Sequence, residues 1–176
     1  VGWAMDFKSP VSSGYHQGEY YSAMLDGSDY LHSTKVQCPG CVQRTESNGR
    51  VHYHHTVVSA TLVKAGSHRG MPLDGEEVRN SDGSDKQDCE LNAAKRLISR
   101  VRQEHPQLPL MIGGDDLYCH EPFIAQLRAL RLPHVLVCKP LSHLELYAWV
   151  EELERLGGWE QGPWQAGPSC RRRFFT

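Results

Sequence analysis

Two groups of residues in this 176-residue chain have types and spacings that suit chemistry. Asp26 and Asp115 each follow an apolar run, and carboxylates from neighbouring strand ends make an oxygen site suited to Mg²⁺. A pair of such ions about 3.5–4 Å apart activates an attacking oxygen and stabilises the leaving oxygen at phosphorus. The alternative is that both are ordinary turn residues, because each has Gly or polar neighbours.

The second group is Cys38 and Cys41, which have the spacing of a zinc knuckle. His52, His54 and His55 follow within reach. On a strand, His52 and His54 share one face and His55 takes the other. The spacing therefore leaves open a Cys₂His₂ zinc site, a Cys₂His zinc site, and a tight Pro-Gly turn with two packed thiols.

The elements that must position these residues follow from hydrophobic periodicity and turn signals. The expected strands are 21–25, 51–64, 71–78, 108–112 and 134–138, and the expected helices are 84–105, 121–130 and 142–156. Three leading strands form an antiparallel meander, and helix-linked strands add in parallel. This α/β order predicts an RNase H-like mixed five-stranded sheet with flanking helices. Asp26 and Asp115 then end its first and fourth strands.

The first helix has the clearest pattern. Ser84 and Gln87 have capping-box spacing, and Leu91, Ala94 and Ile98 begin an apolar stripe. Around this core, we expect an irregular lead-in at 1–20, an RNase H-like catalytic core at 21–158, and the truncated start of a β-rich insertion at 159–176. The first residue, which is not Met, and the abrupt end predict an internal piece of a longer protein.

Composition excludes some classes of protein. Lys plus Arg is 19 and Asp plus Glu is 21, so a net charge of −2 excludes a globally basic nucleic-acid coat, but not a local basic patch. No apolar run approaches the roughly 20 residues that span a bilayer, so we expect no membrane partner. Four of the six cysteines are scattered through expected strands, helices and junctions, which favours reduced thiols and a cytoplasmic setting.

Several runs together resemble a group of bacterial insertion-sequence transposases of the DDE superfamily. The runs are 25–28, 38–41, 53–55, 86–97, 114–118 and 139–143. The match spreads from about Tyr21 to Trp159, and its most specific part is Lys86–Leu97. The resemblance implies an RNase H-like catalytic domain that cleaves DNA at transposon ends and joins the freed 3′-hydroxyl to target DNA.

The resemblance implies catalytic roles for Asp26 and Asp115, which would hold two Mg²⁺ or Mn²⁺ ions. Asp116 stands where the family usually has Gly, and we choose Asp115 because it follows the strand directly. The family's third carboxylate is a Glu on a helix farther downstream than Thr176. As given, the chain should therefore bind metal weakly and catalyse poorly or not at all. Glu90 is the candidate for an in-chain substitute, but we expect it to stabilise the helix dipole or to fix the helix against the sheet through a hydrogen bond at the rim of the core.

In the transposase interpretation, Lys139 and His143 contact DNA, because they follow a strand expected to end at the same sheet edge as the carboxylates. The implied partners are transposon ends, target DNA and a second copy in a synaptic homodimer. The implied location is the bacterial cytoplasm, associated with the nucleoid during action. Two alternatives stay open: another RNase H-like nuclease, and an inactive remnant that acts as a zinc-stabilised DNA-binding or interaction module.

Overall fold

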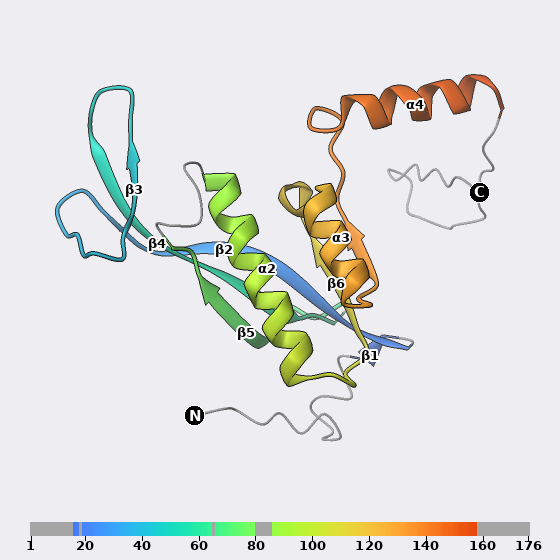
Figure 1. The fold of residues 1–176 in the computed structure, drawn as a ribbon, viewed down its shortest axis with the longest axis horizontal. Coiled ribbons are helices and arrows are strands. Elements are labelled where there is room, and N and C mark those ends of the chain that lie inside the picture. Colours follow the sequence, from blue (N-terminus) through green and yellow to red (C-terminus); the bar gives the residue numbers. More distant parts are fainter. Residues whose placement is uncertain (1–15, 18, 65, 80–85, 158–176) are drawn as a thin grey trace. The chain divides into compact units, whose positions relative to one another are not determined.

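The computed structural model describes residues 16–17, 19–64, 66–79 and 86–157 (Figure 1). Its strands are β1 (His16–Gln17), β2 (Tyr20–Ser33), β3 (Val42–Thr45), β4 (Val51–Leu62), β5 (Met71–Glu77), β6 (Leu110–Gly114) and β7 (His134–Leu136). Its helices are α2 (Lys86–Glu104), the short 3₁₀ helix η1 (Asp116–Tyr118), α3 (Glu121–Ala129) and α4 (Leu144–Arg155). The chain forms two compact units, Val1–Val137 and Cys138–Thr176. The insertion expected at 159–176 and most of the lead-in expected at 1–20 lie outside the described residues.

The strands form one mixed sheet in the first unit. Its main path runs β3-β4-β2-β6-β7, with β1 paired to β2 and β5 paired to β4. The β2–β4 and β4–β5 pairs are antiparallel, and the β2–β6 and β6–β7 pairs are parallel. The predicted α/β class with a mixed sheet is confirmed, and the order β5-β4-β2-β6-β7 is compatible with an RNase H-like fold. The prediction of five strands was too low, because the short strands β1 and β3 bring the described sheet to seven.

Strand β2 is much longer than the predicted strand 21–25. It pairs with β4 from Ala23 opposite Leu62 to Ser33 opposite Tyr53, with a register shift between Asp29 and Leu31. Asp26 therefore lies inside a strand, and the expectation that it ends one was wrong. The chain does not turn after Leu25, because β4 supplies a long run of β-branched residues with which β2 continues to pair. Figure 1 shows β2 and β4 running on together past α2 and carrying β3; we call residues 31–55 the arm.

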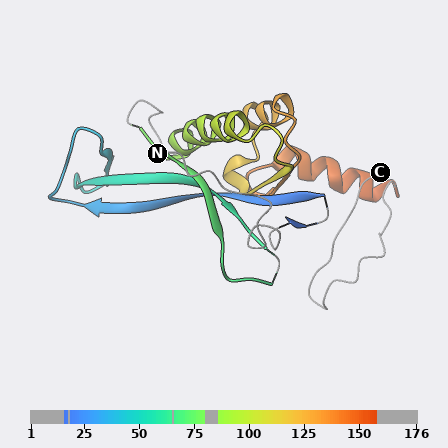
Figure 2. The same cartoon turned by 90° about the horizontal axis from the view of Figure 1, so that it is seen from below.

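Helices α2 and α3 lie on the same face of the sheet (Figure 2). The apolar stripe predicted on the first helix is the face that packs there, since Ala94, Ile98 and Val101 are all buried. The cap predicted at Ser84 lies outside the described residues. Strand residues from β2, β4 and β6 complete the core, among them Ala23, Leu25, Val58, Leu62, Leu110 and Ile112. The sequence pattern thus predicted both the helix and the face that it buries.

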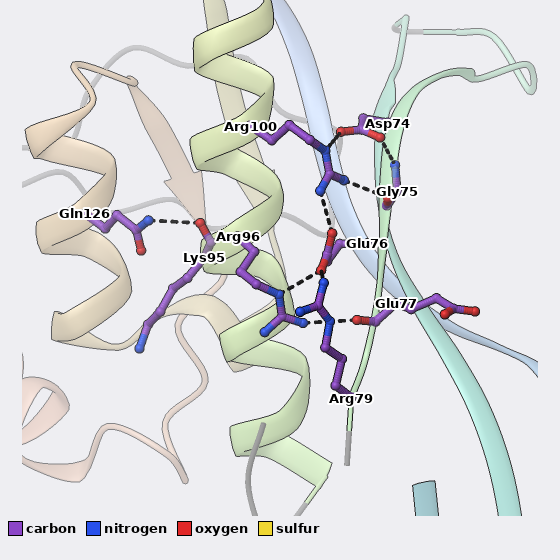
Figure 3. A network of polar contacts seen from close by, with 9 residues as sticks. All are labelled: Asp74, Gly75, Glu76, Glu77, Arg79, Lys95, Arg96, Arg100 and Gln126. Carbon is purple, nitrogen blue, oxygen red and sulfur yellow. Dashed lines mark hydrogen bonds and ion pairs between the residues drawn. The ribbon is translucent and has the colours of Figure 1, made fainter. Parts of the chain in front are cut away.

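Ion pairs fasten α2 to the edge strand β5 (Figure 3). The Glu76 carboxylate is buried and accepts hydrogen bonds from Arg96, at 2.7 Å, and from Arg100. Arg100 also bonds Asp74 at 2.7 Å and the Gly75 carbonyl at 2.8 Å. Burial alone would raise the pKa of Glu76, but the hydrogen bonds and charge of Arg100 and Arg96 outweigh it and hold that pKa below its ordinary value. These arginines therefore position a helix, a role that charge on a helix face did not predict.

Candidate functional site

Asp26 and Asp115 take matching positions relative to two adjacent parallel strands. The ladder between β2 and β6 ends with Met24 opposite Gly113, and Asp26 lies two residues farther along β2, while Asp115 lies two residues farther along the chain, directly after β6. Because side chains alternate along a strand, both aspartates belong to the face that Met24 occupies. Leu25 on the opposite face is buried, whereas Asp26 is exposed. The topology thus gives both sequence-predicted carboxylates the same face of the sheet, Asp26 inside β2 and Asp115 at the end of β6.

Asp115 is held by the local chain. Its backbone is extended, with φ −79° and ψ −172°, and its carboxylate accepts a hydrogen bond of 3.0 Å from the Leu117 backbone N–H. The side chain thereby caps η1 and keeps its second oxygen for another ligand. Asp115 is exposed, but Asp116 is buried with 9% of its surface accessible. This difference supports the choice of Asp115 as the ligand.

Glu90 is a third carboxylate, and it approaches β2 from the opposite face of the sheet, which α2 covers. It lies on α2 and is 6% exposed, and a Cβ built at Gly27 would come within 2.5 Å of its Oε2 atom. Gly27 directly follows Asp26, and a side chain at this position would displace the Glu90 carboxylate. Burial, and then the negative charges of Glu90, Asp115 and Asp26, raise the pKa of Tyr118 well above its ordinary value. The negative charges of all three carboxylates thus disfavour ionisation of the Tyr118 hydroxyl.

The donor set fits Mg²⁺ or Mn²⁺, because carboxylate oxygens are the ligands that these hard cations prefer. The fit concerns the pair Asp26 and Asp115. Among the described residues, no group containing either aspartate brings three ligand atoms within 4.8 Å of one another. The two carboxylates therefore supply ligands of the right chemistry, and a metal site at them stays a prediction.

A separate group of donors lies at the base of the arm. The sulfur atoms of Cys38 and Cys41 are 3.5 Å apart, and they lie 3.1 and 3.4 Å from the Nε2 atom of His55. A hydrogen bond from the Cys41 thiol, followed by bonds from the Gly40 backbone and His55, lowers the pKa of Cys38, whereas burial raises the pKa of Cys41. The described cysteines Cys38, Cys41, Cys119 and Cys138 are all free thiols.

The other histidines of β4 point elsewhere. His52 and His54 lie on the opposite face from His55, as the alternation of a strand predicts. His52 accepts or donates a 2.8 Å hydrogen bond with His32, and His54 lies 3.4 Å from an Asp29 oxygen. Burial, the largest effect, lowers the pKa of His54. The Cys₂His₂ alternative with these two residues is therefore not supported, and His55 remains as the histidine partner of the thiols.

The two residues expected to contact DNA belong to the second unit. Lys139 lies in the turn before α4, where its carbonyl accepts a 3.2 Å hydrogen bond from Ser142 N–H. His143 is the N-cap of α4, and its carbonyl accepts a 3.1 Å bond from Tyr147 N–H. Their placement beside the carboxylates stays a prediction.

Comparisons with known proteins are sparse. No family model matches the chain, and no curated protein matches it. One similar solved chain comes from the cryo-EM structure of the simian T-cell lymphotropic virus intasome in complex with PP2A regulatory subunit B56 gamma. That match has 12% identity and a TM-score of 0.34, and it covers 80% of this chain and 41% of that chain. The likeness is too weak to assign a fold or a function.

The helices give one further finding. Of those in the described part of the chain, none combines the length and apolar character that crossing a bilayer requires.

Proposed function

We propose that this chain carries the catalytic sheet of a bacterial insertion-sequence transposase of the DDE superfamily, with an RNase H-like fold. The observation that carries the proposal is the register of β2 and β6, which gives Asp26 and Asp115 matching positions on one face. The sequence runs that resemble this superfamily support it independently. The proposal also covers location and assembly: the protein would be cytoplasmic, associated with the nucleoid, and would act on DNA as a homodimer.

Asp26 and Asp115 would hold the divalent ions, together with the downstream Glu that the resemblance implies. Bound ions of this kind activate an attacking oxygen and stabilise the leaving oxygen of a phosphodiester. In the first step, water attacks phosphorus and the bond to the 3′-oxygen breaks, which leaves a 3′-hydroxyl and a 5′-phosphate. In the second step, that 3′-hydroxyl attacks a target phosphodiester and releases a new 3′-hydroxyl. Lys139 and His143 would contact DNA phosphates.

The first test is calorimetric titration with Mn²⁺ of the wild type and of Asp26→Asn and Asp115→Asn. Each variant removes a charged oxygen ligand. We therefore expect its apparent affinity for Mn²⁺ to fall at least tenfold, or its binding heat to disappear. Asp29→Asn is the matched control. Asp29 lies on the same strand as Asp26 and pairs with Thr56, but it belongs to the opposite face of the sheet. Unchanged titrations of both site variants would refute the assignment.

The type of reaction needs a second assay. Incubation with Mn²⁺, supercoiled plasmid and an oligonucleotide carrying a free 3′-hydroxyl separates nicking from joining. Joined products that depend on Asp26 and Asp115 support the transposase. Nicking without joining favours the other RNase H-like nuclease. DNA binding without either reaction, by a longer chain that includes the downstream Glu, favours the inactive remnant.

A further inference from the structure

Three potential metal ligands meet at the base of the arm, away from the carboxylates. The atoms are Cys38 Sγ, Cys41 Sγ and His55 Nε2, and all lie within 4.8 Å of one another. Zinc bonds to sulfur are about 2.3 Å and those to imidazole nitrogen about 2.0–2.1 Å, so tetrahedral ligands lie roughly 3.3–3.8 Å apart. The separations here are 3.1, 3.4 and 3.5 Å. One zinc ion therefore fits between these atoms with only small side-chain adjustments.

The sheet register explains why these residues meet. Val42 on β3 is paired with His54 on β4, so the preceding residue, Cys41, comes opposite His55. The chain then turns back at Cys38, where the Cys41 N–H donates to the Cys38 carbonyl at 3.1 Å. In the same turn the Cys38 N–H points at the Cys41 sulfur at 3.2 Å. This backbone turn brings both sulfurs to the same side and leaves them facing the imidazole.

The position of His55 along β4 leaves room for the turn. Strand β2 occupies one edge of β4, so β3 and β5 must both pair with the other edge. Strand β3 covers residues 51–54 and β5 covers residues 57–62, and His55 lies between the two ladders. The CxxC turn therefore fills the space between two partners of the same strand edge.

Burial in the arm points to the same site. Residues 31–55 are all described, and Cys41, at 1% exposure, is the only buried residue among them. Of its apolar side chains, Val36 is 64% exposed, and Val42 is half-buried at the margin of the main core. A segment with so little apolar burial of its own needs another source of order, and bound metal is the usual one in small units. Here the buried residue is itself a metal ligand.

One aromatic side chain covers the imidazole. Tyr30 occupies the irregular position where β2 and β4 shift register, and its ring centroid lies 5.5 Å from that of His55. The Tyr30 hydroxyl donates a hydrogen bond to Glu77 on β5. This contact limits the positions open to the His55 ring, as neighbours of metal-binding histidines commonly do.

We propose that Cys38, Cys41 and His55 bind one Zn²⁺, with water as the fourth ligand, and that the ion fastens the CxxC turn to β4. This structural site is independent of the carboxylates and of the proposed reaction. A disulfide between the two cysteines is the competing arrangement, and it would give His55 no role.

The first experiment measures zinc per chain by mass spectrometry of the metal, after purification under reducing conditions and dialysis against dilute ZnCl₂. We expect Cys38→Ser and His55→Gln each to lower the zinc content by one ion per chain relative to the wild type. His54→Gln is the matched control on the same strand and should keep the wild-type content. Equal zinc in the wild type and His55→Gln, or an equal loss in His54→Gln, would overturn the proposal.

X-ray absorption at the zinc edge, measured on the wild type and on His55→Gln, identifies the atoms bound to the ion. The expected difference between the wild type and His55→Gln corresponds to an ion with two sulfur and two nitrogen or oxygen neighbours. Zinc without sulfur neighbours contradicts the site, as does a disulfide found between Cys38 and Cys41 in reduced preparations.

Hydrogen exchange gives a readout that a misfolded variant cannot mimic. Removing zinc from the wild type with a chelator should speed amide exchange at least tenfold in residues 31–55 and leave α2 and β6 unchanged. Zinc restored to the same sample should reverse the effect. Exchange in the arm that does not respond to zinc would show that the ion has no structural role there.

Discussion

At the scale of single residues, Gly27 marks the closest approach of α2 to the sheet. Its neighbour Asp26 is the first proposed ligand, and the Glu90 carboxylate lies over its Cα. Sequence reasoning treated Gly27 as a turn residue, yet it lies inside β2. The preference for glycine at this position comes from α2, because a Cβ at Gly27 would meet the carboxylate of Glu90.

Gly27→Ala should therefore destabilise the protein by about 1 kcal/mol, because the buried carboxylate must move away from the new methyl group. In a Glu90→Ala background the same change should cost nothing, or stabilise slightly, since Gly is unfavourable in a strand. Urea unfolding of the four proteins of this double-mutant cycle measures the coupling. Equal costs of Gly27→Ala in both backgrounds would show that Glu90 does not lie over Gly27.

At the scale of elements, α2 is held by a packed apolar stripe and by a charged clamp on β5. Glu76 lies at the centre of that clamp, with 7% of its side chain exposed, and its partners Arg96 and Arg100 are 30% and 35% exposed. Removing one member of a buried ion pair leaves the others with uncompensated charge. The partial exposure of both arginines reduces the cost, because water screens their charge.

Glu76→Gln should lower the free energy of unfolding by about 2 kcal/mol at pH 7. The pKa of Glu76 is held below its ordinary value, so its stabilisation is complete above the unfolded pKa of about 4.3 and is lost as pH falls through the lower folded value. Denaturant unfolding from pH 7 to pH 2 should show the wild type and the variant converging in acid. Glu104→Gln, at an exposed position on α2, is the control and should change little. A constant gap between wild type and Glu76→Gln at every pH would contradict the clamp.

The elements also show what a sequence can predict here. Periodicity predicted α2 and its buried stripe, because that pattern is local to one helix. It did not predict the full length of β2 or the existence of β3, because both depend on pairing with β4. Alternation on β4 separated His55 from His52 and His54, but only the register of β3 selects His55 as the partner of Cys41. The roles of Arg96 and Arg100 depend on β5, which is distant in sequence.

At the scale of the whole molecule, the apolar core belongs to one of the two compact units. Every residue of the described core cluster lies between Tyr21 and Leu132, inside the unit that ends at Val137. Helix α4, in the second unit, has no buried residue. The pairing of β7 with β6 is also completed inside the first unit, since Val137 N–H donates to the Gly114 carbonyl at 3.0 Å.

A fragment that ends at Val137 should therefore fold, with a free energy of unfolding within about 1 kcal/mol of that of the full chain, because it keeps the whole described core. A fragment that ends at Leu130 is the control. It loses β7 and the buried Leu132, as well as the bond between Ile112 N–H and the Pro133 carbonyl, so it should be strongly destabilised. Circular dichroism during urea unfolding of both fragments and the full chain measures the difference. A fragment to Val137 that is unfolded in buffer would show that the second unit contributes to the stability of the first.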